Sequence, residues 1–229
     1  MTNYTTAEEL LDHHKKVLGD EFGSLYNLLY NELSRLYIKW EQFEILYASK
    51  PSRITILNQT APLFFRTVQN LLWEDVLLHL ARMVDKTRLG KKENVSIRWI
   101  PEYVADSFKK KEIADKVEEA VSLTSFAVDW RNRRIAHRDR SLSTNSAVMP
   151  LEPASILKVK AASKSIEAVL NWVESNYFGS TVMYDLGGHP GGSLSLLHYL
   201  VDGIEESTNR LMRKEDGTAK DSDYGPRAV

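Results

Sequence analysis

Residues 63–84 of the chain read LFFRTVQNLLWEDVLLHLARMV. Apolar side chains recur along this stretch at steps of three and four residues, which is the spacing that an α-helix produces. They also cover most of the circumference of such a helix, so that little of its surface suits contact with water. We therefore expect a helix over residues 63–86 to lie at the centre of a helical core.

The helical spacing continues on both sides of this stretch. Residues 20–49 carry a long apolar stripe with several aromatic side chains, and residues 153–178 carry another stripe. Pro62 is expected to kink or restart the helix that begins near Ile54, because proline removes a backbone donor and clashes with the preceding turn. No segment shows the alternation of apolar and polar residues that is typical of a half-buried strand. The sequence therefore predicts an all-α bundle of about five to seven helices.

Length, composition and charge exclude several classes of protein. The chain has 229 residues, 43% of them hydrophobic, and a net charge of −1, so it can bury a core but presents no overall basic field to nucleic acid. It has no cysteine and therefore no disulfide. No apolar run approaches the roughly 18 residues that span a membrane, and the N-terminus has no signal pattern. We expect a cytoplasmic protein without membrane contact, with one domain over residues 1–213 and a polar tail over residues 214–229.

The densest basic cluster lies at the end of a long helical pattern near the middle of the chain. Residues 130–140 read WRNRRIAHRDR, which places five arginines around one histidine and one asparagine. Histidine, with an ordinary pKa near 6.5, gives or takes a proton at neutral pH, and arginine is a permanent planar cation that binds phosphate oxygens. RNA carries its own nucleophile in the 2′-hydroxyl. These residue types therefore suffice to cleave RNA without a metal or another cofactor.

The positions of Arg131, Asn132 and His137 resemble the signature of the HEPN superfamily, an all-helical group with many metal-independent ribonucleases. The sequence of the cluster is also similar to that of the AbiU-type branch, which is linked to abortive infection in bacteria. A second stretch resembles that branch too, with ARMVD at residues 81–85 and NVSI at residues 94–97. The resemblance covers about residues 60–180 and implies a HEPN-like helical bundle.

The resemblance also implies roles for the residues of the cluster. Arg131 would stabilise charge on the phosphate, His137 would transfer protons, and Asn132 would orient either the histidine or the phosphate. We expect no metal ligands in this site. The other four arginines are candidates for binding RNA, namely Arg133, Arg134, Arg138 and Arg140. Some members of the superfamily carry, two residues after the histidine, a tyrosine that a partner nucleotidyltransferase modifies; this chain has Asp139 there, which puts that route of control in doubt.

Helix geometry raises a question about the site. On an ideal helix Arg131 and His137 are six residues apart and point about 120° away from each other. Either the helix distorts near His137, or a second chain completes the site. HEPN proteins usually dimerise with both motifs at one cleft, so the resemblance implies a homodimer with two-fold symmetry.

Three polar residues of the central helix also lie near one face, because Asp75, His79 and Arg82 are spaced by four and three residues. They form either a hydrogen-bonded polar seam between helices or a support for the catalytic centre. Three functions remain open for the whole chain. The first is a ribonuclease of a defence or toxin–antitoxin system, whose partners would be RNA and an antitoxin or another defence protein. The second is a HEPN module that binds RNA or nucleotide without cutting, and the third is a purely structural helical dimer.

Overall fold

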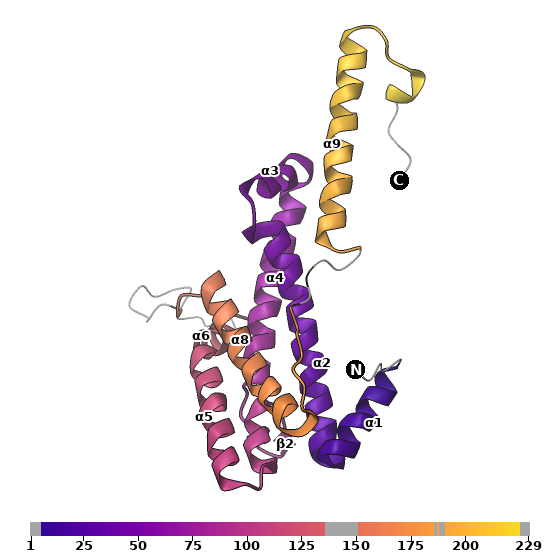
Figure 1. The fold of residues 1–229 in the computed structure, drawn as a ribbon. Coiled ribbons are helices and arrows are strands. Elements are labelled where there is room, and N and C mark those ends of the chain that lie inside the picture. The colour runs from indigo at the N-terminus through magenta and orange to yellow at the C-terminus, as the bar shows by residue number, and fades with distance from the viewer. Residues whose placement is uncertain (1–5, 136–150, 186, 188–190, 225–229) are drawn as a thin grey trace, which may run out of the picture. The chain divides into compact units, whose positions relative to one another are not determined.

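The computed structural model describes residues 6–135, 151–185, 187 and 191–224 (Figure 1). Over these ranges the protein is all-α, as the sequence predicts, and strand pairing is confined to one short hairpin. The described part of the chain already holds more α-helices than the five to seven expected. The difference arises because Pro62 starts a new helix, as anticipated, and because Thr124 separates two helices where one was expected.

The helices follow the chain in a simple order. The α-helices are α1 (Ala7–Leu18), α2 (Asp20–Phe43), α3 (Pro51–Thr60), α4 (Pro62–Met83), α5 (Ser107–Leu123), α6 (Ser125–Trp130), α8 (Ile156–Val173) and α9 (Ser193–Glu215). Within the described ranges, three π-helical turns extend α2, α6 and α8, namely η1 (Glu44–Ala48), η3 (Arg131–Ile135) and η4 (Glu174–Phe178). In the described part of the chain, two segments are 3-10 helices, η2 (Ile97–Tyr103) and η5 (Asp221–Asp223). The antiparallel hairpin is formed by β1 (Arg88–Leu89) and β2 (Lys92–Glu93).

Polar side chains and glycine fix several of these boundaries. Thr6 and Glu9 form a capping box at the start of α1, with bonds of 3.1 and 3.2 Å to backbone N–H groups that lack helical partners. Ser155 caps α8 in a similar way. The helical run that α8 begins ends at Gly179, whose φ of 63° lies in the left-handed region that glycine adopts without strain.

The chain forms two compact units. The first unit comprises residues 1–40 and 72–186, and the second comprises residues 41–71 and 187–229. The boundary between them falls within α2 and α4. The single domain proposed over residues 1–213 stays a prediction. None of the described helices is both long enough and apolar enough to cross a membrane.

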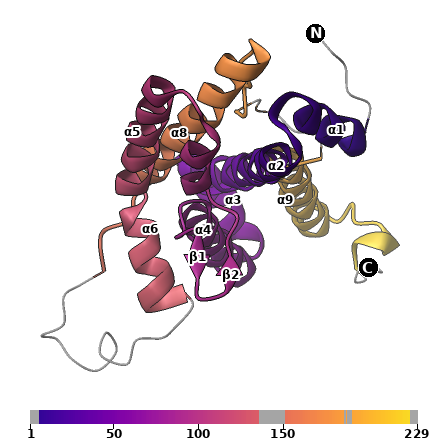
Figure 2. The ribbon, with the colours of Figure 1, turned by 90° about the horizontal axis from the view of Figure 1, so that it is seen from below.

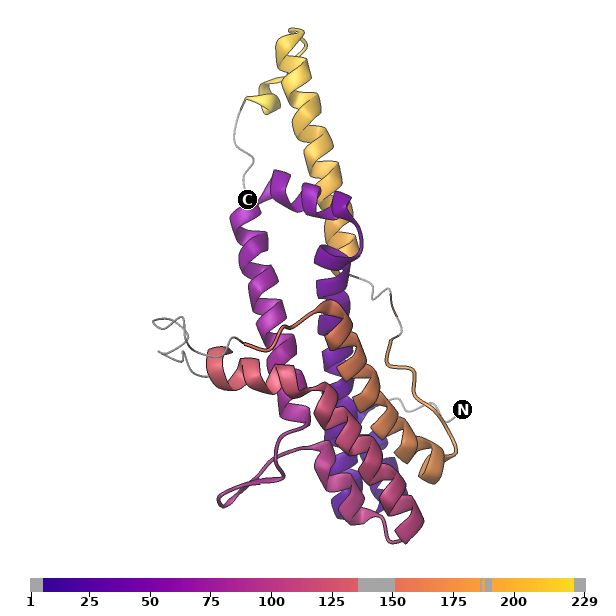
Figure 3. The ribbon, with the colours of Figure 1, turned by 90° about the vertical axis from the view of Figure 1, so that its left-hand side faces the viewer.

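The core of the first unit is built on the C-terminal half of α4. Val76, Leu77, Leu80 and Ala81 are completely buried there, and α5 runs beside α8 in the same unit (Figure 3). Four residues of α2 that are also fully buried share one face of that helix, namely Tyr26, Leu29, Leu33 and Leu36. This part of α4 has the central position that its apolar circumference predicts.

The N-terminal half of α4 differs from the expectation. Leu63, Phe64 and Leu71 are exposed, with 80%, 60% and 62% of their surface accessible. Phe65 is the buried exception in this half and belongs to the core of the second unit, so the dense apolar pattern marks a mostly buried helix only in the C-terminal half of α4. An apolar circumference shows that a helix can be buried on all sides, but the elements packed around it decide where it is buried.

The second unit has its own small core, in which α3, η1 and α9 meet. Leu46, Leu57, Phe65 and Leu197 form this cluster. In the polar tail, the guanidinium of Arg213 binds both carboxylate oxygens of the buried Asp223 at 2.8 and 3.0 Å.

Candidate ribonuclease site

The motif begins where α6 changes into the π-helical turn η3. Such turns are rare and occur frequently at functional sites. The helix therefore leaves α geometry within the motif. Such a distortion was one of the two explanations offered for the wide angle between Arg131 and His137 on an ideal helix. Arg131 to Arg134 belong to this turn, whereas His137, Arg138, Asp139 and Arg140 lie outside the described residues.

Arg131 is held by two neighbours. It donates from Nε to Oδ1 of Asn132 at 3.0 Å, and from Nη1 to Oδ1 of Asp85, which follows the end of α4. The side chains of Arg131 and Asp85 are only 19% and 26% exposed, so water screens this ion pair less than it screens a surface pair. Within the described ranges, no hydrogen bond or ion pair uses Nη2 of Arg131, and this end of the planar group remains able to bind an anion.

Asp85 in turn is fixed by residues that follow the hairpin. The buried hydroxyl of Ser96 donates to the backbone oxygen of Asp85 at 2.6 Å and to that of Met83 at 3.3 Å. Nε of Arg98 donates to the backbone oxygen of Val84 at 2.8 Å. These bonds satisfy carbonyl groups at the end of α4 that have no helical partner. Residues 81–85 and 94–97 therefore act together to place one carboxylate against Arg131.

The other two described arginines of the motif have different partners. Nη1 of Arg133 lies 3.4 Å from Oδ1 of Asp129, one turn earlier. The guanidinium of Arg134 stacks over the Trp130 ring at 5.0 Å, and its Nε lies 3.6 Å from the Glu74 carboxylate on α4. The two contacts of Arg134 combine side-chain packing with charge pairing. The side chain of Arg134 remains about half exposed.

The chain re-enters the described structure close to the helix that it left. The backbone N–H of Glu152 donates to the Asp129 carboxylate at 2.9 Å, and its backbone oxygen accepts from Nε1 of Trp130 at 2.8 Å. The backbone of Glu152 is therefore anchored to the end of α6. Nothing in the sequence predicts these bonds to residue 152.

The polar residues of the central helix form a polar seam with α2. Nζ of Lys39 lies 2.6 Å from the Asp75 carboxylate, and Oε2 of Glu32 lies 2.9 Å from Nε2 of His79 and 3.8 Å from Nη2 of Arg82. Burial lowers the pKa of His79 from its usual 6.5 to about 4, and the Glu32 carboxylate opposes this shift only in part. His79 is therefore neutral at pH 7. These contacts agree with a structural seam between helices.

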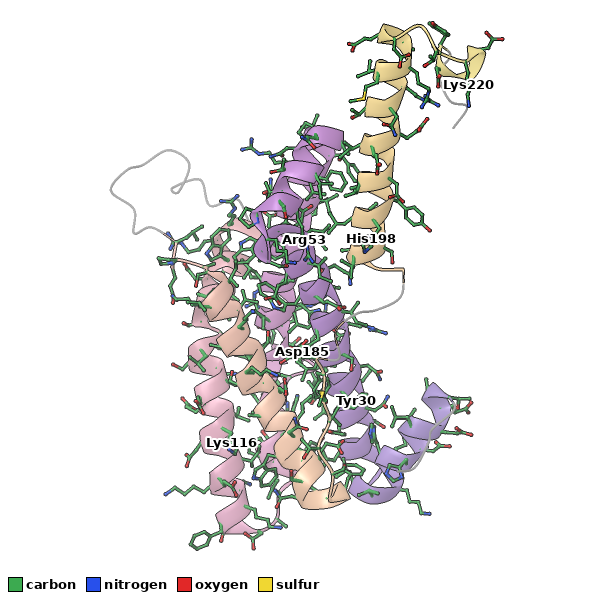
Figure 4. All side chains as sticks on the ribbon, turned by 45° about the horizontal axis from the view of Figure 1, so that its top comes forward. Tyr30, Arg53, Lys116, Asp185, His198 and Lys220 are labelled. Carbon is green, nitrogen blue, oxygen red and sulfur yellow. The ribbon has the colours of Figure 1, made fainter. Side chains whose placement is uncertain are left out.

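The buried His79 predicts how stability depends on pH. Between pH 6.5 and about 4 the unfolded chain protonates this histidine while the folded chain does not, so the free energy of unfolding should fall as the pH falls through this window. We expect His79→Gln to flatten the dependence of melting temperature on pH. His198→Gln is the matched control, because His198 is exposed on α9 (Figure 4) and its loss should leave the wild-type profile intact. Parallel profiles for wild type and His79→Gln would contradict the prediction.

No group of three metal-binding side chains is found among the described residues. The chemistry that the described part of the motif offers is cationic. It consists of a fixed guanidinium with one free edge, together with nearby arginine side chains.

Comparison with models of known families identifies the family of the chain. A family model described as HEPN_AbiU2 (AbiU2) matches residues 19–191. The chain belongs to the AbiU2 family of HEPN proteins. Comparisons with curated proteins and with solved structures found no match.

Membership of the AbiU2 family confirms the HEPN resemblance and puts the chain in the context of abortive infection. The matched region is longer than the 60–180 expected, and it contains α2 as well as the Asp85–Arg131 pair. Sequence reasoning selected the stretch at residues 81–85 without assigning a role to Asp85. It missed Ser96 and Arg98 as the residues that fix Asp85, because their contribution is to cap a helix end that only the fold brings to them.

Proposed function

We propose that this AbiU2-family protein is a metal-independent endoribonuclease of a bacterial defence or toxin–antitoxin system. The observation that carries the proposal is Arg131, which Asn132 and Asp85 hold in place while Nη2 is left for a phosphate oxygen. A preorganised cation is what a reaction needs when negative charge grows on phosphorus in the transition state.

In the proposed reaction the 2′-hydroxyl of RNA attacks the adjacent phosphate. The O2′–P bond forms, the P–O5′ bond breaks, and the products are a 2′,3′-cyclic phosphate and a free 5′-hydroxyl. His137 transfers protons at these oxygens, and Arg131 stabilises the extra charge. Asn132 acts through Arg131 as a positioning residue, which is a third role beside the two expected from the sequence.

The direct test is an incubation of purified protein with total RNA in the presence of EDTA. Cleavage by the wild type and its loss in His137→Ala would support the enzyme. Product ends distinguish this chemistry from metal-dependent hydrolysis, because only attack by the 2′-hydroxyl leaves a cyclic phosphate.

One observation favours a second candidate function, binding of RNA or nucleotide without cleavage. The Asp85 carboxylate already neutralises part of the charge of Arg131, and a neutralised cation stabilises a transition state less well. The same assay separates the two functions, since a binding module would retain RNA on a filter and leave it intact. If the protein neither binds nor cleaves RNA, the remaining candidate function is that of a purely structural helical dimer.

We also propose that the protein is a two-fold symmetric homodimer in which the Arg131–His137 segments face each other. This proposal rests on the tendency of HEPN proteins to dimerise with both motifs at one cleft. The angle between Arg131 and His137 adds no separate support, because the π-helical turn already offers another explanation of it. We expect light scattering at micromolar concentration to give the mass of two chains. A monomer would contradict the prediction, and so would a dimer whose motifs lie on opposite outer faces. RNA and an antitoxin or another defence protein remain the proposed partners.

A further inference from the structure

The β1–β2 hairpin lies between the two stretches that fix Asp85 against Arg131. It leaves the first stretch just after Asp85 and returns just before Ser96. Figures 2 and 3 both show it projecting from the first unit on the same side as α6, which leads into the motif. The hairpin is therefore an arm attached directly to the candidate site.

The arm carries a concentration of positive charge that the whole chain lacks. Residues 86–93 contain four basic residues and one acidic residue, whereas the net charge of the chain is −1. All four basic side chains are exposed, namely Lys86, Arg88, Lys91 and Lys92. The strand residues are exposed as well, so this sequence contributes little to any hydrophobic core. Like charges gathered on so short an arm repel one another, and an anionic partner would relieve that repulsion.

The base of the arm is fixed by hydrogen bonds. Nδ2 and the backbone N–H of Asn94 donate to the backbone oxygens of Lys86 and Thr87 at 2.8 and 2.9 Å. Nη2 of Arg88 lies 3.1 Å from Oε1 of Glu93, and the guanidinium of Arg88 stacks over the Trp99 ring at 5.2 Å from its centroid. The three lysines show no ion pair within the described residues. They are the cations of the arm that remain for a ligand.

The length of the arm suits several nucleotides. A strand rises about 3.3 Å per residue, so the turn at Gly90 lies at most roughly 17 Å along the chain from Asp85. Each strand of a duplex carries a phosphate about every 3.4 Å along the helix axis, and phosphates lie further apart on an extended single strand, so this reach covers at most roughly five phosphates. A strand whose phosphate is bound at Arg131 would therefore pass within reach of the arm.

We propose that the hairpin Arg88–Glu93, together with Lys86, binds the phosphate backbone of an RNA strand beside the phosphate held by Arg131. This inference rests on the proposed function, because it takes RNA as the ligand of the site. Binding of this kind reads charge and spacing rather than base sequence, and it weakens steeply with salt.

The test compares two pairs of exposed lysines. Lys91→Gln/Lys92→Gln removes two charges from the arm. Lys110→Gln/Lys111→Gln removes two charges from the start of α5, which lies about 20 Å along that helix from its end at α6. The probe is a labelled 2′-O-methyl RNA oligonucleotide, which lacks the nucleophile and cannot be cut by the proposed reaction. Binding is followed by fluorescence anisotropy at several salt concentrations, and melting temperatures check that both variants fold.

We expect the arm variant to bind about tenfold more weakly at 0.15 M salt, and its salt slope to fall by about 1.4, which is the value for two lost contacts to single-stranded phosphate. The control variant should match the wild type. The inference is wrong if both variants bind alike, or if the wild type does not bind the probe. Cleavage of ordinary RNA is measured separately. Cleavage that does not depend on the arm would overturn this inference and leave the proposed function standing, whereas binding through the arm without cleavage would support the inference and overturn the ribonuclease.

Discussion

His137→Ala is expected to slow RNA cleavage by about 10²–10⁴-fold, with EDTA present throughout. Alanine cannot exchange a proton with the 2′-hydroxyl or with the leaving 5′-oxygen, whereas imidazole does so near neutral pH. The measurement is the initial rate of cleavage of a labelled RNA at saturating concentration. EDTA itself should leave the wild-type rate unchanged, because the proposed chemistry takes its positive charge from arginine.

His198→Ala is the matched control, since His198 is an exposed histidine on α9 in the second unit (Figure 4). It should cleave at the wild-type rate. The mechanism is wrong if EDTA abolishes cleavage, or if His137→Ala cuts as fast as the wild type. Retention of RNA binding by His137→Ala would show that the loss concerns proton transfer and not the binding surface.

Arg131→Lys is expected to lose about 10²–10³ in cleavage rate, the size of effect typical of removing one transition-state donor. Lysine keeps the charge but offers a compact ammonium group in place of a planar fork. Arg131 bonds Asn132 through Nε and Asp85 through Nη1, and in the proposed mechanism Nη2, which has no partner among the described residues, binds the phosphate. An ammonium group on a flexible stem cannot reproduce this geometry, and the fixed position of the cation is lost with it.

Arg134→Lys provides the comparison within the same turn. Arg134 is about half exposed and makes a longer contact of 3.6 Å to Glu74, so a lysine there should change cleavage only a few-fold. We expect the loss in Arg131→Lys to appear in kcat, and a loss in Arg134→Lys to appear mainly in KM. Equal losses in the two variants would show that total charge, and not the fixed position of Arg131, governs the reaction.

The sequence by itself determined the fold class, the positions of most helices and the family. These features are local. The spacing of apolar residues sets α2 and α8, Pro62 starts α4, and Gly179 ends the run that follows α8. The motif could also be found from the sequence alone, because Arg131, Asn132 and His137 lie within a few residues of one another. The family match over residues 19–191 confirmed the family, whereas the roles of the three motif residues stay predictions.

Only the tertiary structure decided which carboxylate meets Arg131. Asp85 lies 46 residues earlier in the chain, and several acidic residues were equally available to a sequence argument. The choice follows from packing, because Ser96 and Arg98 cap the end of α4 and so fix the direction of Asp85. Likewise, apolar spacing could not show that Leu63 and Phe64 are exposed while Leu77 and Leu80 are buried. Side-chain period is a property of one helix, but burial and ion pairing depend on which other elements pack against it.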